Sequence, residues 1–224
     1  MRMGENGAHV STRPRDAPMN ARSARGSNKG VGHVRIIGGR WRGTKLPVTD
    51  RPGLRPTSDR VRETLFNWLQ PALPGAQVLD LFAGSGALGL EAVSRGAAHA
   101  QLVEADPGLA AALADTVRRL DAGDAVAIHR GDALSWMRTN AGPFDIAFVD
   151  PPFAAALWAQ VVALLPALLG ADAWLYLESP AGEVPALPAG WRLHREGSTR
   201  DVRYALYRRG TLDATSTSGD LRTT

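Results

Sequence analysis

The chain has 224 residues, of which 44% are hydrophobic and 21% charged, and it contains no cysteine. This length suits one domain with a sizeable core, and the lack of cysteine excludes disulfides and cysteine-based metal sites. No apolar run reaches the roughly 18 residues that a membrane span needs, and no apolar segment follows the N-terminal charges as in a secretory signal. We therefore expect a cytoplasmic protein with no metal site and no membrane partner.

The net charge of +4 is unevenly distributed along the chain. Residues 1–62 hold 14 basic and four acidic side chains, a net charge of +10, whereas the remaining residues hold 12 basic and 18 acidic ones, a net charge of −6. A basic front and an acidic body predict that one part binds a polyanion and the other a cationic ligand. Composition bias of the genome is the alternative explanation for the preference for arginine over lysine.

The N-terminal third predicts an extension, a hairpin and a helix. Residues 1–32 are rich in Arg, Ser and Gly, and we expect them to form a disordered basic extension. Residues 33–54 predict a small β-hairpin, with strands over 34–37 and 41–48 around the turn residues Gly38 and Gly39. Thr57, Ser58 and Asp59 offer N-cap oxygens for a helix that ends near Leu69.

Strands and helices alternate from residue 77 onward. Short apolar strands are expected over 78–82, 101–104, 125–128, 146–149 and 174–177, and a final hairpin over 191–195 and 202–207. Helices are expected between these strands over 87–95, 107–120, 132–138 and 154–169. This pattern predicts an α/β, Rossmann-like fold over residues 55–210, with a seven-stranded, mostly parallel sheet covered by helices on both faces. The C-terminal hairpin would be antiparallel, and residues 211–224 would form a flexible tail.

A glycine-rich loop follows the strand over 78–82. Asp80 lies at the end of this strand, and the loop contains the G-x-G-x-x-G spacing typical of cofactor-binding loops. A dinucleotide pyrophosphate would be repelled by a carboxylate there, whereas S-adenosylmethionine carries a sulfonium and an ammonium that acids favour. Asp80 as a simple helix cap is the alternative. The cofactor-binding residues expected here are Asp80, Phe82, Ala83, Gly84, Ser85 and Gly86.

Two further acids follow the next strands. Glu104, beside Ala105, is expected to accept hydrogen bonds from the two ribose hydroxyls of an adenosine cofactor. Asp132, beside Ala133, is expected to accept one from the adenine amino group, although a Gly-Asp pair also suits an ordinary turn. Acids at the carboxyl ends of adjacent parallel strands meet at the edge where such sheets bind ligands, so each strengthens the other two assignments.

The sequence Asp150-Pro151-Pro152-Phe153 follows the fourth strand of this series. The prolines lack amide donors and fix the chain direction, which leaves carbonyls free to accept hydrogen bonds. Asp150 and the Pro151 carbonyl would bind the exocyclic amine of a base, and Phe153 would stack on its ring. Because the lone pair of such an amine is delocalised into the ring, orienting its N–H bonds and accepting its proton would promote methylation.

These motifs resemble a known family. Asp80–Gly89 and Asp150–Phe153 resemble the amino-methyltransferases of nucleic acids, and Val34–Leu46 with Arg55–Leu69 resemble the bacterial small-subunit ribosomal RNA guanine-N2 methyltransferases. The resemblance covers His33 to Arg209 and implies S-adenosylmethionine-dependent methylation of one guanine of 16S rRNA during assembly of the small subunit. The family usually has Tyr where this chain has Phe153, so the stacking ring is kept and a hydroxyl is lost.

Basic side chains gather around the predicted hairpin and helix start. We expect a monomer in which these side chains contact the rRNA backbone, with strong salt dependence. Solvated surface charge is the alternative, and Arg60 and Arg62 could instead pair with acids near the cofactor. The residues concerned are Arg35, Arg40, Arg42, Lys45, Arg55, Arg60 and Arg62.

Three other functions stay open on sequence grounds. A DNA adenine-N6 methyltransferase would use the same Asp150–Phe153 motif, although the chain is short for an added target-recognition domain. A non-catalytic RNA-binding assembly protein could retain the fold, but the intact set of acids argues against it. An NAD oxidoreductase is disfavoured by Asp80.

Overall fold

The computed structural model describes residues 32–48, 58–152 and 157–210. The expectations for the N-terminal extension, the C-terminal tail, Arg55 and Phe153 lie outside these ranges. Within them, the structure contains a two-stranded sheet and a seven-stranded sheet.

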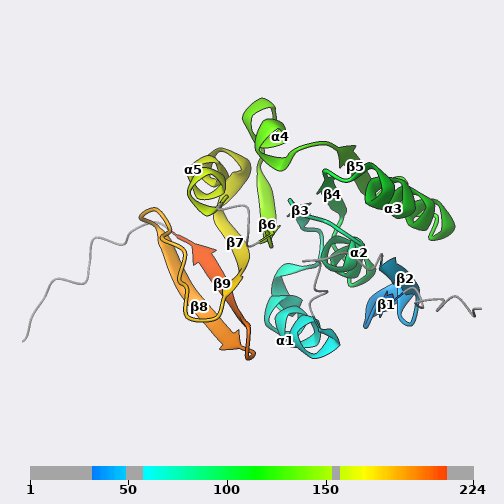
Figure 1. Cartoon of the computed structure of the whole chain (residues 1–224), viewed down its shortest axis with the longest axis horizontal. Coiled ribbons are helices and arrows are strands. Elements are labelled where there is room, and N and C mark those ends of the chain that lie inside the picture. The colour runs from blue at the N-terminus through cyan, green and yellow to red at the C-terminus, as the bar shows by residue number, and fades with distance from the viewer. Residues whose placement is uncertain (1–31, 49–57, 153–156, 211–224) are drawn as a thin grey trace, which may run out of the picture. The chain divides into compact units, whose positions relative to one another are not determined.

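The seven-stranded sheet has the order β5-β4-β3-β6-β7-β9-β8 (Figure 1). Its strands are β3 (Gln77–Asp80), β4 (His99–Glu104), β5 (Val126–Arg130), β6 (Phe144–Val149), β7 (Leu169–Pro180), β8 (Trp191–Ser198) and β9 (Val202–Arg209). In this order, the neighbouring strands β5, β4, β3, β6 and β7 pair in parallel. Strand β9 pairs antiparallel with both β7 and β8. The predicted sheet is therefore confirmed, including its C-terminal antiparallel hairpin.

The strand order places a switch point between β3 and β6. The chain builds outward from β3 through β4 to β5 and then returns to place β6 on the other side of β3. Successive connections on the two sides run in opposite directions, and open α/β sheets bind ligands beyond the carboxyl ends of the strands at such a switch point.

Helices cover both faces of the sheet, as expected. They are α1 (Asp59–Leu69), α2 (Ala87–Ser94), α3 (Pro107–Arg119), α4 (Ala133–Thr139) and α5 (Trp158–Leu168). Apolar residues of α1, α2 and α3 pack in one core cluster with Val78 and Phe148, and those of α4 and α5 pack in a second with Leu79 and Val149. Neighbouring strand residues point to opposite faces, so each strand contributes to both cores. Figure 1 shows α4 and α5 on the side of β6 away from α1 and α2.

Local sequence signals explain where several helices begin. Ser58 accepts a hydrogen bond from the Val61 amide at the start of α1 (3.3 Å). Asp106 caps α3 through the Leu109 amide (2.9 Å), and Pro107 occupies the first turn. Side-chain oxygens at these positions satisfy amides that a helix leaves unpaired at its N-terminus.

The N-terminal hairpin consists of β1 (Gly32–Arg35) and β2 (Lys45–Val48). The expected second strand from Trp41 is wrong in its first part, because Gly39–Trp41 forms a 3-10 turn. Gly39 has a φ of +73°, and a Cβ there would lie 1.8 Å from the Ser94 carbonyl oxygen. Close packing against the end of α2 therefore bends a segment whose composition alone suits a strand.

Candidate methyltransferase active site

Three acids predicted from the sequence lie at the carboxyl ends of adjacent strands. Asp80 ends β3, Glu104 ends β4 and Asp150 follows β6 directly. Asp80 is 3% and Glu104 9% exposed, whereas Asp150 is partly exposed at the rim. The charge of Glu104 raises the pKa of Asp80, and the charge of Asp80 raises that of Asp150, so the fold brings the three acids together on both sides of the switch point.

Asp80 is a buried acid with an unusually high proton affinity. Burial is the main cause that raises its pKa to about 7, against hydrogen bonds from the Gly89 and Phe82 amides that lower it. Its Oδ2 accepts from the Gly89 amide within α2 (3.1 Å). Asp80 therefore anchors α2, which is the helix-cap alternative that the sequence left open, and its contact with a cofactor stays a prediction.

Glu104 holds the glycine-rich loop in place. Its two oxygens accept hydrogen bonds from the Gly84 amide (2.8 Å) and the Asp106 amide (2.7 Å). Gly84 and Gly86 have φ values of +54° and +76°, and a Cβ on Gly84 would meet no atom within 4 Å. The loop thus exposes backbone at Gly84, where a bound group can approach closely. A carboxylate offers about four acceptor positions, so Glu104 keeps capacity for hydroxyl donors.

The remaining residues predicted to bind the cofactor surround this loop. Ala83 is buried, and its amide bonds to the Val103 carbonyl (3.0 Å), while Phe82 and Ser85 are partly exposed and Ala105 is exposed. Gly131 donates to the Glu104 carbonyl (3.0 Å), which places the following pair, Asp132 and Ala133, beside the end of β4.

Asp132 caps a helix in this structure. Its Oδ1 accepts from the Ser135 amide at the start of α4 (2.8 Å), and the side chain is exposed. This is the turn role that the sequence left open for Asp132. The adenine contact stays a prediction, made through the second carboxylate oxygen.

Asp150 lies directly after β6, at the switch point, and is followed by two prolines. Its pKa is raised well above the usual range, first by burial and then by the charges of Glu178 and Asp80. Pro151 is buried and Pro152 is exposed, so the chain turns outward at this point.

Glu178 is an acid of the same cluster that the sequence analysis missed. It lies on β7, is 5% exposed, and accepts a hydrogen bond at Oε1 from the hydroxyl of fully buried Tyr176 (2.7 Å). Burial and the charge of Glu178 raise the pKa of Tyr176 well above its usual range. The sequence does contain the signal that predicted Glu104 and Asp150. Glu178 is an acid directly after an apolar strand, here the one predicted to end at Leu177.

The charge of this site suits a cationic ligand. Among the described residues, no Arg or Lys forms an ion pair with Asp80 or Asp150, and no group of His and acidic side chains could hold a metal ion. Buried acids without such partners favour a ligand that carries positive charge. The sulfonium and ammonium of S-adenosylmethionine meet this requirement, and the open backbone at Gly84 leaves room beside it.

The basic residues of the N-terminal region divide into exposed and buried ones. Arg40, Arg42, Lys45 and Arg60 are exposed, and Arg35, with 68% of its side chain exposed, pairs with Asp59 (3.0 Å). These side chains are available to a polyanion.

The assignment of Arg62 to the RNA-binding surface is wrong. Arg62 is fully buried, and its Nη2 donates to Asp59 (2.7 Å) and to the Arg35 carbonyl (2.8 Å). Its Nη1 lies 3.8 Å from Glu91. No phosphate can reach a side chain that is enclosed by the protein. The structure instead shows the alternative in which Arg62 pairs with acids, here Asp59 and Glu91.

Glu91 joins the hairpin to the helix that follows the glycine-rich loop. This fully buried carboxylate on α2 accepts from the amides of Ile37 (2.6 Å) and Gly38 (2.7 Å) and from Arg95 Nε (2.6 Å). The basic hairpin is therefore fixed to the same helix that Asp80 anchors. Sequence reasoning missed this residue, although an acid inside the apolar run Ala87–Ser94 was a signal.

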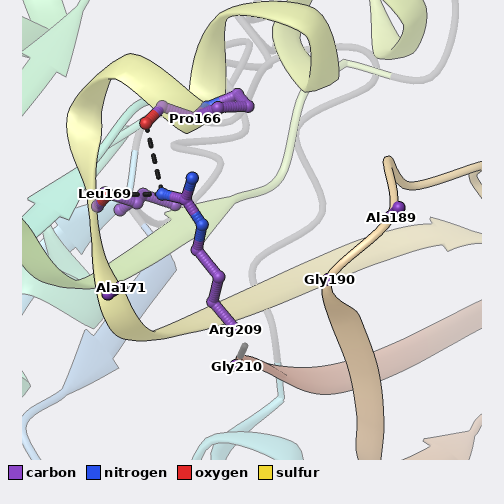
Figure 2. Close-up of a pocket in the computed structure, with 7 residues that line it drawn as sticks. All are labelled: Pro166, Leu169, Ala171, Ala189, Gly190, Arg209 and Gly210. Atoms are coloured by element: carbon purple, nitrogen blue, oxygen red, sulfur yellow. Dashed lines mark hydrogen bonds between the residues drawn. The ribbon is translucent and has the colours of Figure 1, made fainter. Parts of the chain in front are cut away.

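A hollow of about 510 Å³ lies away from these acids, between the end of α5 and the C-terminal hairpin. Arg209 Nη1 bridges it by donating to the carbonyls of Pro166 (3.2 Å) and Leu169 (2.5 Å) (Figure 2). The hollow is lined by Pro166, Leu169, Ala171, Ala189, Gly190, Arg209 and Gly210. No acid lines it, so we assign the chemistry to the strand-end acids.

The fold and the acidic switch point define a Rossmann-like, S-adenosylmethionine-dependent methyltransferase. A putative methyltransferase of this dependence from Streptococcus mutans, 14% identical, shares the fold with a TM-score of 0.60 over 74% of this chain and 53% of that one. Among the described residues, no helix is long and apolar enough to cross a membrane.

Comparisons with known proteins then place the chain in a family. The model of the family described as conserved hypothetical protein 95 matches residues 34–208. Ribosomal RNA small subunit methyltransferase D is 50% identical in Escherichia coli K12 (82% of this chain, 93% of that protein) and 41% identical in Haemophilus influenzae (79% and 94%). A solved putative methyltransferase, yhhF from Escherichia coli, is 47% identical with a TM-score of 0.74 (80% and 99%). The chain belongs to this family of methyltransferases, which confirms the resemblance noted from the sequence.

Proposed function

We propose that this chain transfers a methyl group from S-adenosylmethionine to the exocyclic N2 of one guanine in 16S rRNA, in the cytoplasm during maturation of the small subunit. The observation that carries the proposal is the position of Asp150 and Pro151 at the end of β6, across the switch point from Asp80. The relatives are named ribosomal RNA small subunit methyltransferase D, which supports the choice of RNA as the substrate.

The cofactor supplies an electrophilic methyl group whose transfer leaves a neutral thioether. Asp80 and Glu104 would hold it, through charge and through hydroxyl contacts respectively, and the loop from Phe82 to Gly86 would lie against it. Because the acids are buried, their charges act through a less polarisable medium than water and attract a cation more strongly.

Asp150 and the Pro151 carbonyl would orient the amine of the base. Two acceptors aimed at the N2 hydrogens turn the nitrogen toward the methyl group, and Asp150 takes the proton that the nitrogen releases. The two oxygens of Asp150 also favour guanine over adenine. Guanine offers adjacent N1–H and N2–H donors, whereas adenine presents an acceptor at the ring nitrogen beside its amine.

The exposed basic residues of the hairpin and α1 would bind the rRNA backbone. Arg35, Arg40, Arg42, Lys45 and Arg60 are accessible in the structure, and their contacts with phosphate would position the RNA without selecting a base. The hydrogen bonds from Ile37 and Gly38 to Glu91 hold this surface at a fixed place on α2.

The test is methyl transfer by the purified full chain. Labelled S-adenosylmethionine is supplied with free rRNA, with partly assembled small subunits or with DNA, and the modified nucleosides are identified by mass spectrometry. We expect N2-methylguanosine in RNA and no methylation of DNA. N6-methyladenine in DNA would support the adenine methyltransferase instead.

A matched pair of variants tests the role of Asp150. Asp150→Asn should lower kcat by a factor of about 10² to 10⁴, the usual contribution of a general base, with RNA affinity unchanged. Asp172→Asn removes an exposed carboxylate from β7 and should leave kcat unchanged. Full turnover by Asp150→Asn would refute the assignment.

A further inference from the structure

Glu178 and Tyr176 lie next to Asp150 on the same face of the sheet. Strands β6 and β7 are parallel, with Phe148 opposite Tyr176 and Val149 opposite Leu177. Continuing this register by one residue brings Asp150 opposite Glu178. Because side chains alternate between faces, Asp150 and Glu178 share the face on which Phe148 and Tyr176 pack.

Glu178 is a buried carboxyl group, with 5% of its surface exposed. An apolar side chain would fill the same place without the cost of removing a charge from water. The Tyr176 hydroxyl, itself fully buried, donates to Glu178 Oε1 at 2.7 Å and fixes the orientation of the carboxylate. An oriented buried acid beside the proposed base indicates a role in proton transfer.

Ionisable groups from β3, β7 and β9 act on Asp150 or on the Tyr176–Glu178 pair. Asp80 on β3 and Glu178 on β7 both raise the pKa of Asp150. Tyr204 on β9 lies opposite Glu178, and its charge, with those of Glu178 and Asp150, acts on Tyr176. After burial, the negative charges of Glu178 and Asp80 therefore strengthen the hold of Asp150 on a proton.

We propose that Glu178, oriented by Tyr176, is a positioning residue that keeps Asp150 basic enough to take the proton released by the substrate amine. The inference rests on the proposed function of Asp150. As the new bond from nitrogen to the methyl carbon forms, the methyl–sulfur bond breaks and its electron pair stays on sulfur. The nitrogen then loses one proton to the Asp150 carboxylate. Glu178 stabilises the protonated form of Asp150, because ionised Asp150 would place two negative charges side by side.

Glu178→Gln tests this role, because it removes the charge and keeps the size and the acceptor for Tyr176. Asp150 must be ionised to act, so kcat rises with pH on the acid side of the profile. Without the neighbouring charge, Asp150 ionises at lower pH, and the acid limb should move down by about one pH unit. Glu183→Gln, at an exposed position after β7, should leave the limb unchanged.

A second measurement does not depend on turnover. Carboxyl signals of ¹³C-labelled aspartate in the full chain are followed by NMR across pH, with Asp150 assigned by the loss of its signal in Asp150→Asn. We expect Asp150 to titrate at lower pH in Glu178→Gln than in the wild type. An unchanged titration of Asp150 would overturn the proposal, even if kcat fell.

The conservative variant Glu178→Asp separates charge from shape. It keeps the negative charge, so the titration of Asp150 and the acid limb should stay close to those of the wild type. If Glu178→Gln fails to fold, Glu178→Asp provides the test on its own. Titration of Asp150 in that variant at the pH of an ordinary aspartate would contradict the proposal. If the wild type methylates no nucleic acid but Asp150 still responds to Glu178, the proposed function fails and the coupling stands.

Discussion

Replacing Asp80 by Asn should make the protein more stable without cofactor and unable to bind the cofactor. Asp80 is 3% exposed, and burial raises its pKa to about 7 from the ordinary 3.8. Asparagine has nearly the same shape, and its Oδ1 can keep the hydrogen bond from the Gly89 amide. The substitution therefore removes the charge and, like protonation of Asp80, the second acceptor oxygen that faces the Phe82 amide.

The magnitude follows from the linkage between protonation and folding. Each unit of pKa difference between folded and unfolded states corresponds to about 1.4 kcal/mol. A rise of about three units means that ionised Asp80 lowers the free energy of unfolding by up to about 4 kcal/mol. The folded state holds the proton of the Asp80 carboxyl group more tightly than the unfolded state does. The loss of stability caused by ionised Asp80 is therefore absent below pH 4 and grows as pH rises to about 7.

The assay is urea unfolding of the wild type and Asp80→Asn at pH 4, 6 and 8, without cofactor. We expect the variant to gain stability relative to the wild type as pH rises, with equal stabilities near pH 4. Asp124→Asn, in an exposed loop, should show no such trend. S-adenosylmethionine at 100 times its Kd should stabilise the wild type by about 2.7 kcal/mol and the variant far less. A variant that is less stable than the wild type at pH 8, or that binds the cofactor equally well, would refute this reasoning.

Two further substitutions test the hairpin. Glu91→Gln removes the charge of a buried carboxylate that accepts hydrogen bonds from two hairpin amides. It should lower the free energy of unfolding in urea by about 3–5 kcal/mol and speed hydrogen exchange at the Ile37 and Gly38 amides. Glu63→Gln, on the exposed side of α1, should do neither. Unchanged exchange at both amides would count against this attachment. Arg42→Ala should weaken rRNA binding and lower the slope of log affinity against log salt by about 1, while Arg200→Ala in the β8–β9 turn should not. Equal slopes for the two variants would indicate that the hairpin does not contact phosphate.

The sheet and most of the site could be predicted because they depend on local pattern. Apolar strands separated by amphipathic helices define the parallel order, and each acid directly after a strand falls at the carboxyl edge. This rule identified Asp80, Glu104 and Asp150. Applied to the strand predicted over 174–177, it would also have found Glu178, the fourth member of the cluster.

Contacts between distant segments account for what the sequence did not predict. The 3-10 turn over Gly39–Trp41 depends on packing against Ser94, 55 residues beyond Gly39. Arg62 was grouped with exposed arginines by charge, although it precedes Leu65, Phe66 and Leu69 by three, four and seven residues. That spacing assigns it to the buried face of α1, where its hydrogen bonds to Asp59 and to the Arg35 carbonyl and its proximity to Glu91 make burial tolerable.

The most direct test of the central claim is the modification state of rRNA in a strain that lacks this chain. Mass-spectrometric mapping should find one guanine of 16S rRNA without its N2-methyl group, restored by the wild-type chain and not by Asp150→Asn. A fully methylated 16S rRNA in the deletion strain would contradict the account.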